Sequence, residues 1–521
     1  MRVFEKLFVL LLLFIGIIYV GRDLWGVKFD HYPGDKWDTR FNNAILEHNY
    51  RFFRGIEKSY LSAKFFYPAK KSIAGSDHHF FPSLIYSFFR LCGLDMFYSF
   101  SLWVLILFLI NYFSSFYILI KSGINFFLSS IGAFLFSFSL PIMAQTMHVQ
   151  TLYIFPIPFI FYSLQKFFET NNYKYFLKFF IFFLILYYTS PYFSCFILIP
   201  IFLFIFTNLI INREKFLNYI YKDIFLKLFT VIVFLILVLP FYFIYTKTGH
   251  FWSKSHIIKN LPSFIAYIVP FHGSFLYKNF SLYFWKFQTD PWHKEYSFGL
   301  ITSLILFFYI FKGIKSRDLL PYIITIFLTI LIFTKIGNFT LYSLILNIKI
   351  FHKAQAVWRY YHILIFPIVF CSLKSIQKYT SNFKLKNFIY IFLIISVLVE
   401  NFPLKNSMKN TPILEIKNAH KDLEEIVKLK RKEEHKCFAL ILPDSLKNKN
   451  IKIDLVSTII VYQNLNFPTI NGYTTFSPKG YNMWDEPIWQ DVVNWLKYNG
   501  WEEDKINNKV LKIYFDGQKY Y

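Results

Sequence analysis

Two aspartates, Asp35 and Asp38, stand close together in the segment Tyr32-Pro-Gly-Asp-Lys-Trp-Asp38, just after the first strongly apolar run of the chain. A carboxylate at the edge of a membrane span can meet a lipid-borne phosphate and an aqueous acceptor, and it can act as a general base on a hydroxyl. Each residue also has a structural interpretation, because Asp38 occupies an N-cap position and Asp35 can shape the Pro-Gly turn. We treat both as candidate catalytic residues, and their types leave open which one is the base.

Three further groups of polar residues are candidates for contacts with a substrate. In Ser76-Asp-His-His79, Asp77 and His78 would supply a second acid/base pair or bind sugar hydroxyls, and a solvated turn is the alternative. His148 and Gln150 lie in a short polar turn, where a satisfied interface residue is the alternative. Asp290 and His293, in Asp290-Pro-Trp-His293, would form part of a rim. An Asp-His-His group without a distant third ligand is a weak metal signal, so we predict no metal and no cofactor.

Lys353 and Arg359 lie in Phe351-His-Lys-Ala-Gln-Ala-Val-Trp-Arg-Tyr-Tyr361, ahead of a late apolar run. The planar fork of Arg matches phosphate oxygens, and positive charge stabilises a phosphate leaving group as its own charge develops. The alternative is an interfacial Arg that snorkels beside aromatic neighbours. The segment is therefore a candidate phosphate-binding site.

The elements that position these residues must be largely membrane-embedded. Of the 521 residues, 55% are hydrophobic and 23% are aromatic, which is far more apolar mass than one soluble core needs. No nucleic-acid motif accompanies the formal net charge of +25, and basic residues beside membrane spans are expected on topological grounds. The charge favours anionic lipid headgroups or phosphates as partners, and not nucleic acid.

Apolar runs long enough to cross a hydrocarbon layer of roughly 30 Å predict about eleven transmembrane helices, because open strands cannot satisfy their backbone in lipid. These runs lie near residues 4–20, 97–120, 125–144, 150–168, 176–190, 191–211, 224–246, 299–313, 319–335, 359–374 and 387–402. The first run lacks a convincing small-residue cleavage site, so we interpret it as a signal anchor and not as a cleaved signal peptide.

The short loops set the orientation. Basic residues fall on one side of the predicted spans, at Lys121 and in the loops 166–178, 213–222, 312–317 and 374–386. That side is the cytoplasm, and the N-terminus lies there too. The protein is then a multi-pass protein of the inner (cytoplasmic) membrane. Its active site faces outside, where 21–96 forms a large first extracytoplasmic loop.

The chain beyond about residue 403 also falls outside. The strand-like pieces 437–442 and 453–461 and the amphipathic stretch 488–496 predict a small α/β domain. The predicted fold is a membrane all-α protein with its N-terminus inside, divided into a transmembrane catalytic domain, 1–402, and an extracytoplasmic C-terminal domain, 403–521.

Several of these motifs resemble the GT-C superfamily of membrane glycosyltransferases, which use polyprenyl-phosphate sugars and place an essential acid in the first outer loop. Asp38-Thr-Arg-Phe41 and Ala44-Ile-Leu-Glu47 look like the opening of the aminoarabinose and protein-mannosyl transferase branches. The remaining matches are to a poorly characterised bacterial branch, and they lie at Phe65-Phe-Tyr-Pro68, Ser76-Asp77, Trp358-Arg359 and Asn471-Gly-Tyr-Thr-Thr-Phe-Ser-Pro478. The chain departs from the superfamily by lacking an adjacent Asp-Glu pair.

The resemblance implies inverting transfer of a hexosyl or pentosyl group from a polyprenyl-phosphate donor to an acceptor hydroxyl on a glycan, a lipid or a protein. Asp35 or Asp38 would be the base, Arg359 with Lys353 would hold the phosphate, and Asp77, His78 and His148 would line the sugar or acceptor pocket. Glu47, His48 and Gln150 are further expected substrate contacts. Some superfamily members use a divalent ion, so the resemblance leaves metal dependence open.

Two other functions fit a many-helix membrane protein of this kind. A flippase or transporter of lipid-linked sugars needs ionisable residues inside its helices, and few are evident. A polymerase or ligase that joins lipid-linked glycans also combines many helices with a large outer loop. Outer acids and topology favour the transferase, although likeness of fold alone does not define a substrate.

Overall fold

A computed structural model describes residues 2–521 apart from 27, 216–218, 220, 248–250, 289–293, 338, 382–385, 405–410, 448, 450, 475–476 and 484–485. The chain forms two compact units. The first comprises residues 1–27, 104–240 and 251–409, and the second comprises 28–103, 241–250 and 410–521. The second unit thus joins the first predicted outer loop to the C-terminal region, a grouping that the sequence did not predict.

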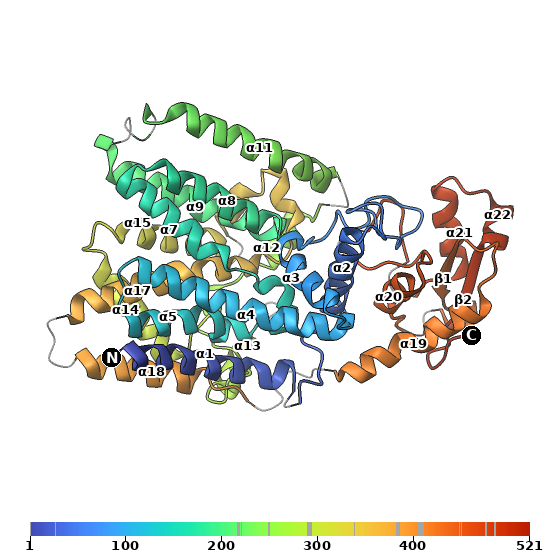
Figure 1. Ribbon diagram of the computed structural model, residues 1–521, viewed down its shortest axis with the longest axis horizontal. Coiled ribbons are helices and arrows are strands. Elements are labelled where there is room, and N and C mark those ends of the chain that lie inside the picture. Colours follow the sequence, from blue (N-terminus) through green and yellow to red (C-terminus); the bar gives the residue numbers. More distant parts are fainter. Residues whose placement is uncertain are drawn as a thin grey trace. The chain divides into compact units, whose positions relative to one another are not determined.

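The first unit is helical, and its long helices run beside one another in Figure 1. Helix α4 begins in the second unit and α11 ends there. The long helices are α1 (Arg2–Leu24), α4 (Met96–Lys121), α5 (Phe126–Phe138), α7 (Pro156–Thr170), α8 (Tyr173–Tyr187), α9 (Pro191–Ile211), α11 (Ile224–Lys247), α14 (Leu300–Gly313), α15 (Leu320–Phe333), α17 (Tyr361–Thr380) and α18 (Lys386–Glu400). Short helices and 3-10 turns connect them: α6 (Leu140–Met143), η1 (Thr146–Leu152), η2 (Arg213–Lys215), α12 (Lys254–Lys259), η3 (Phe264–Tyr267), α13 (Lys278–Trp285), α16 (Tyr342–Ile345), η5 (Lys349–Lys353) and η6 (Val357–Tyr360).

Each apolar range predicted as a span overlaps one of these long helices. Five segments among the described residues are long and apolar enough to cross a membrane: Val3–Arg22, Met96–Lys121, Phe126–Met143, Pro191–Ile211 and Ile224–Lys247. Helices α14 and α15 are apolar but shorter. This architecture fits an all-α membrane protein with several membrane-spanning helices. The count of about eleven spans and their orientation stay predictions.

The second unit combines several helices with a small parallel sheet, and α19 and α22 contact strand β2 of that sheet. Its helices are α2 (Asp38–Phe53), α3 (Phe80–Leu91), α19 (Ile413–Lys430), η7 (Asp444–Leu446), α20 (Leu455–Leu465), α21 (Trp489–Tyr498) and α22 (Glu503–Lys509). Strands β1 (Cys437–Ile441) and β2 (Val510–Tyr514) pair in parallel, with Cys437 opposite Val510. Helix α2 packs against α3 and α20, and α19 packs against α20.

Two of the three elements predicted in the tail are confirmed, because β1 lies within 437–442 and α21 begins at Trp489, one residue into the stretch 488–496, and runs past its end. The prediction of a strand at 453–461 is wrong, since this stretch forms α20. The side chain of Asp454 caps the helix by accepting a hydrogen bond from the Ser457 N–H at 3.1 Å, and Leu455–Gln463 are buried on every face. A β-branched run buried all round carries no periodicity that separates a strand from a helix.

Candidate functional site

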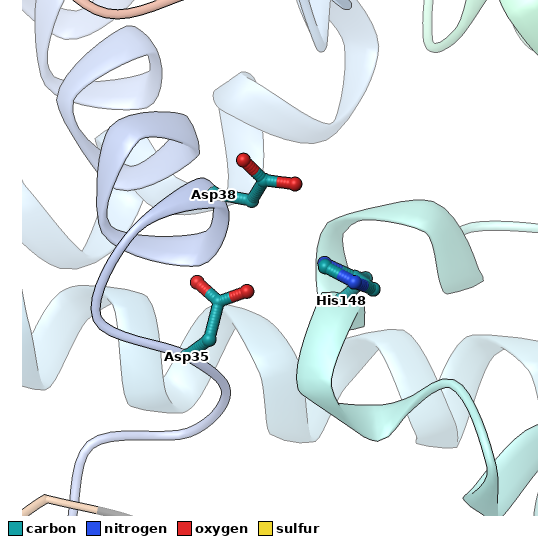
Figure 2. A group of neighbouring side chains, drawn as sticks. All are labelled: Asp35, Asp38 and His148. Carbon is teal, nitrogen blue, oxygen red and sulfur yellow. The ribbon is translucent and has the colours of Figure 1, made fainter. Parts of the chain in front are cut away.

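Asp35 and Asp38 lie together where helix α2 begins. Figure 2 shows Asp35 in the loop ahead of the helix and Asp38 in its first turn, with both carboxyl groups emerging at the helix start. One oxygen of each carboxylate lies within 4.8 Å of the other. Two acids at this separation differ in role only if their surroundings differ.

The helix-capping role falls to Asp35. Its Oδ1 accepts hydrogen bonds from the backbone N–H groups of Trp37 and Thr39, both at 2.9 Å. The preceding Gly34 has φ +94°, and an added Cβ would lie 2.5 Å from Thr39 Oγ1. The prediction that Asp38 is the N-cap is therefore wrong. The Pro-Gly turn brings Asp35 over the first turn, where it satisfies N–H groups that the helix leaves without partners.

Asp38 instead accepts a hydrogen bond from the phenol of Tyr473, with a distance of 2.6 Å from Tyr473 Oη to Asp38 Oδ1. The Tyr473 ring also contacts Trp37 and Phe41, with ring centroids 6.4 and 5.5 Å away. Burial raises the pKa of Tyr473, and the negative charge of Asp38 raises it further. The phenol therefore stays protonated and donates to the Asp38 carboxylate.

Two of the sequence motifs meet strand β1 next to the segment that carries Tyr473. The backbone N–H of Phe66, in Phe65-Phe-Tyr-Pro68, donates to the Asn471 carbonyl at 3.2 Å. The buried amide of Asn471 both accepts from the Leu440 N–H, at 2.6 Å, and donates to the Leu440 carbonyl, at 2.9 Å. A Cβ on Gly472 would lie 2.3 Å from Phe66 Cδ1. Strand β1 thus anchors the segment that presents Tyr473 to Asp38.

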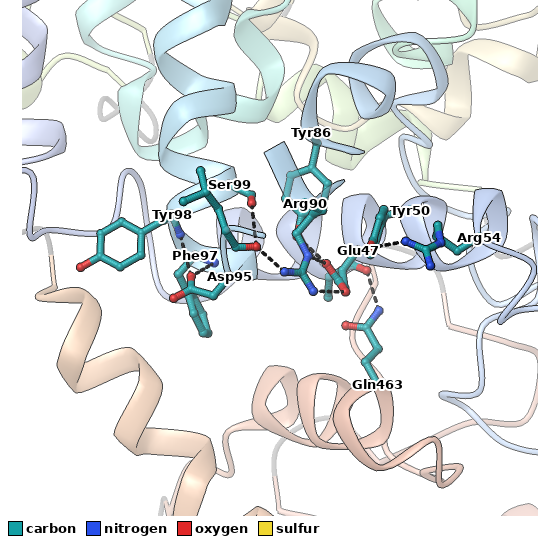
Figure 3. A network of polar contacts seen from close by, with 12 residues as sticks. Glu47, Tyr50, Arg54, Tyr86, Arg90, Asp95, Phe97, Tyr98, Ser99 and Gln463 are labelled. Atoms are coloured by element: carbon teal, nitrogen blue, oxygen red, sulfur yellow. Dashed lines mark hydrogen bonds and ion pairs between the residues drawn. The ribbon is translucent and has the colours of Figure 1, made fainter. Parts of the chain in front are cut away.

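Glu47 lies on α2 within a network of polar contacts (Figure 3). Its carboxylate accepts from Arg90 Nε at 2.8 Å, from Arg90 Nη2 at 3.1 Å and from Tyr86 Oη at 2.7 Å. Glu47 and Arg90 line a pocket of about 410 Å³ together with residues of α19. The fork from Arg90 occupies both carboxylate oxygens, which is a geometry that holds helices α2 and α3 together.

Three buried histidines, His48, His78 and His79, lie around helix α2. The Nε2 of His48 lies 3.1 Å from the carbonyls of both Ser59 and Tyr60, so His48 ties the following loop to α2. The carbonyl of His78 accepts from Asn49 Nδ2 at 2.7 Å and from Tyr60 Oη at 3.1 Å. His79 Nε2 lies 2.7 Å from Asn42 Oδ1, and burial lowers the pKa of His79 to about 3. The neighbouring Asp77 is half-buried.

In the first unit, Arg359 lies in η6 just before α17. Its guanidinium carbon is 6.0 Å from the centroid of the Tyr192 ring, and the His362 Nδ1 lies 2.9 Å from its carbonyl oxygen. The buried Nε–H of Arg359 makes no hydrogen bond within the described part of the chain. A buried guanidinium N–H without a partner is costly, so an anion that accepts from it would be stabilised.

Lys353 is 3% exposed and ends η5. Its Nζ lies 4.2 Å from the centroid of the Phe251 ring. Burial, together with the positive charge of Lys349, lowers the pKa of Lys353 to about 8. The side chain is therefore a cation at neutral pH that titrates just above it.

The segment before α14 supplies residues of this unit that the sequence did not single out. Lys294 is 1% exposed, and its Nζ lies 5.5 Å from the centroid of the Trp358 ring. Glu295, equally buried, pairs with His272 at 3.0 Å and accepts from Trp285 Nε1 at 2.9 Å. Burial raises the pKa of Glu295 despite these contacts. The sequence contains many lysines, and Lys294 differs from most of them only in its burial, so no sequence pattern could have identified it.

The remaining candidates divide between the units. His148 belongs to the first unit, where it stands at a kink in η1 with φ −125° and ψ 53°. The Gln150 side chain and the predicted rim residues Asp290 and His293 lie outside the described residues. The candidate acids therefore lie in the second unit, and the candidate phosphate ligands lie in the first.

Tyr473 and Arg40 are two residues of the second unit to which sequence reasoning assigned no role. Arg40 is 2% exposed and pairs with Asp454. Both residues stood inside quoted motifs, so motif membership was the available signal. No protein-family model matches the chain, and no curated protein matches it either.

Proposed function

We propose that the protein is an inverting glycosyltransferase of the GT-C type, which moves a sugar from a polyprenyl-phosphate donor to an acceptor hydroxyl at the outer face of the cytoplasmic membrane. The observation that carries the proposal is the aspartate pair at the start of α2. Asp35 is committed to the helix backbone, and Asp38 is held by a neutral phenol. Because the two acids have different environments, one of them can act as the positioned base while the other has a structural role.

Asp38 is the stronger candidate for the base. Asp35 Oδ1 accepts two backbone N–H groups of the helix start, so this carboxylate is committed to capping α2. The hydrogen bond from Tyr473 fixes the orientation of the Asp38 carboxylate. As the acceptor oxygen forms its bond to the anomeric carbon, Asp38 would take the hydroxyl proton.

Arg359 and Lys353 are the proposed ligands of the donor phosphate. The bond from the anomeric carbon to the phosphate oxygen breaks in the same step, and its electron pair leaves with the polyprenyl phosphate. Arg359, with a buried Nε–H that makes no hydrogen bond among the described residues, offers a donor to that phosphate. Lys353, charged at neutral pH, adds a second positive charge.

The test compares glycans, glycolipids and glycoproteins by mass spectrometry in a host strain that lacks the gene and carries one variant at a time. Asp38→Asn should fail to restore the missing sugar, because loss of a general base costs roughly 100- to 10,000-fold in rate. Asp30→Asn is the matched control, since Asp30 is an exposed acid of the same region. Full restoration by Asp38→Asn would remove it as the base.

Arg359 tests the phosphate side separately. Arg359→Lys keeps the charge but loses the planar fork, so a bidentate contact to phosphate predicts a large loss of transfer. A snorkelling Arg predicts no loss, because Lys also reaches the interface. Accumulation of a polyprenyl-linked oligosaccharide in the deletion strain, in place of the loss of one sugar, would contradict monosaccharide transfer and favour a polymerase or flippase.

A further inference from the structure

A pocket of about 520 Å³ opens in the first unit, away from every residue of the proposed reaction. Its walls come from the end of α4, the C-terminal part of α7, the loop before α15 and the C-terminal part of α17. The residues that line it are Ser122, Gln165, Lys166, Glu169, Ser316, Asp318, Leu319, Phe370, Lys374, Gln377, Lys378 and Ser381. Most of them belong to loops, or adjoin loops, that the charge pattern predicts to be cytoplasmic.

Two lysines of α17 define the chemistry of this pocket. Lys374 and Lys378 stand one helical turn apart, so they share a face of α17. The Nζ of Lys374 donates to the Ser122 carbonyl at 2.6 Å, and the Nζ of Lys378 donates to Ser316 Oγ at 3.4 Å. Neither lysine forms an ion pair with a carboxylate in the part of the chain that the structure describes. Like charges at this spacing destabilise a helix, and an anion bound between them removes the repulsion.

The two acids of the pocket offset part of its positive charge, because the negative charges of Glu169 and Asp318 both act on Lys374. Glu169 is already engaged, because it pairs with Lys166 at 2.6 Å and accepts from Gln165 Nε2 at 2.7 Å. Asp318 is exposed and makes no ion pair with a described residue. Three lysines and two acids line the pocket, so it keeps a formal net charge of +1, and Lys374 and Lys378 are the lysines that no carboxylate pairs with among the described residues.

The wall that carries the lysines is fixed in place. Gln377 donates to the Gly123 carbonyl at 2.8 Å and accepts from the Asn125 N–H at 2.6 Å, which ties α17 to the turn between α4 and α5. Hydroxyl groups of Ser316 and Ser381 border the same space. A fixed pair of ammonium groups with hydroxyl donors beside it is suited to a tetrahedral oxyanion.

We infer that this pocket binds a phosphate group, either that of a phospholipid headgroup or that of a small soluble phosphate ester. The shared chemistry is a phosphate held between Lys374 and Lys378, with the Ser316 hydroxyl, which accepts from Lys378, as a further donor. The pocket has room for more than the phosphate itself, so the substituent on the phosphate lies inside it as well. This inference does not depend on the proposed sugar transfer.

Binding can be measured on the purified full-length protein in a neutral detergent. Three probes separate the sources: short-chain phosphatidylglycerol, glycerol phosphate and inorganic phosphate, with a phosphate-free diacylglycerol as the blank. Lys374→Gln and Lys378→Gln should each weaken phosphate binding by roughly tenfold, as expected for loss of one charge-assisted hydrogen bond. Lys378 is exposed, so its replacement leaves the fold intact even if Lys374→Gln lowers the melting temperature.

Lys312→Gln is the matched control, because Lys312 is an exposed lysine of the same predicted face that does not line the pocket. It should bind each probe as the parent does. Lysine-dependent binding of the phospholipid alone identifies a lipid site, and lysine-dependent binding of the soluble esters identifies a metabolite site. Equal affinity of Lys378→Gln and the parent for all three phosphates would overturn the inference.

Discussion

At the scale of single residues, the chemistry proposed for the second unit depends on the different hydrogen-bond partners of Asp35 and Asp38. They share a turn and are of one type, yet Asp35 receives backbone N–H groups and Asp38 receives the phenol of Tyr473. The difference arises from Gly34, whose positive φ turns the chain so that Asp35 lies over the helix start. The neighbouring groups, and not the residue type, therefore distinguish the proposed role of Asp38 from that of Asp35.

Tyr473→Phe tests this arrangement, because it removes only the hydroxyl that orients Asp38. A hydrogen bond to a charged group contributes about 1.5–3 kcal/mol, so we expect a loss of transfer of roughly 10- to 100-fold. The loss should appear in kcat and not in KM, as fits a positioning residue that does not bind substrate. Unchanged kcat with normal stability would argue against Asp38 as the base. Tyr498→Phe, at an exposed tyrosine of the same unit, is the control.

If Lys353 binds the donor phosphate as proposed, donor binding should depend on pH. Burial lowers the pKa of Lys353 to about 8, so the side chain is charged below pH 8 and loses its proton as the pH rises. Affinity for a polyprenyl-phosphate sugar should then be full near pH 7 and fall between pH 8 and pH 10. Lys353→Arg should keep its affinity over that range, because Arg stays protonated. Equal pH profiles for the two proteins, measured by donor titration in detergent, would exclude Lys353 from the phosphate site.

At the scale of elements, α2 is more deeply buried than its amphipathic pattern indicates. Residues Thr39–Asn49 are buried without exception, and Arg40 among them pairs with Asp454 at the start of α20. Burial raises the pKa of Asp454, but the charge and hydrogen bond of Arg40 outweigh this effect and the net pKa is lowered. The ion pair therefore fixes α2 against α20.

Removing one partner should be costly, because it leaves a charge without compensation. Arg40→Met should lower the free energy of unfolding by about 3 kcal/mol, whereas the double variant Arg40→Met/Asp454→Leu should recover much of that loss. The contribution of the lowered Asp454 pKa is complete above its unfolded value of about 3.9 and disappears as the pH falls below it. Denaturant unfolding between pH 3 and pH 7 measures both effects. Equal stability of the single and double variants would show that the pair does not couple the helices.

Gly472 provides a second test of how elements meet. A Cβ there would lie 2.3 Å from the Phe66 ring, so Gly472→Ala should displace the segment that carries Tyr473 and reduce transfer. Phe66→Leu in the same chain should restore part of the activity, since it removes the ring from that space. Activity and melting temperature of the single and double variants measure this. No rescue, with both proteins folded, would mean that the ring contact does not position Tyr473.

Sequence reasoning predicted the elements that local patterns determine, and it missed those that depend on burial or on contacts between distant parts of the chain. Apolar length predicted helices at every expected span, because lipid leaves the backbone few alternatives. Local alternation also predicted β1. The same pattern gave a wrong prediction at α20, because a Val- and Ile-rich run that is buried on all faces does not separate a strand from a helix. Local sequence patterns also did not predict the contact from Tyr473 to Asp38, because this contact joins residues hundreds of positions apart.

At the scale of the whole molecule, the composition of the second unit restricts the topology. Residues 28–103 and the chain beyond 410 fold into one compact unit, joined for example by the hydrogen bond from the Tyr32 N–H to the Thr411 carbonyl at 2.8 Å. A bilayer cannot pass through a packed core. We therefore expect both segments to lie on the same side of the membrane and the chain between them to cross it an even number of times, and the predicted topology has the same property.

Single cysteines test that conclusion without any knowledge of the substrate. In a cysteine-free background, Lys71→Cys in the first loop and Ser445→Cys in the tail, both at exposed positions, should react with an impermeant maleimide in intact spheroplasts. Lys315→Cys, exposed in a loop predicted to be cytoplasmic, should react only after lysis. If the loop and tail sites are both protected until lysis and Lys315→Cys reacts at once, the orientation is inverted but the shared side stands. Opposite behaviour of the loop and tail sites would contradict the compact second unit itself, because one folded core would then have to lie on both sides of the membrane.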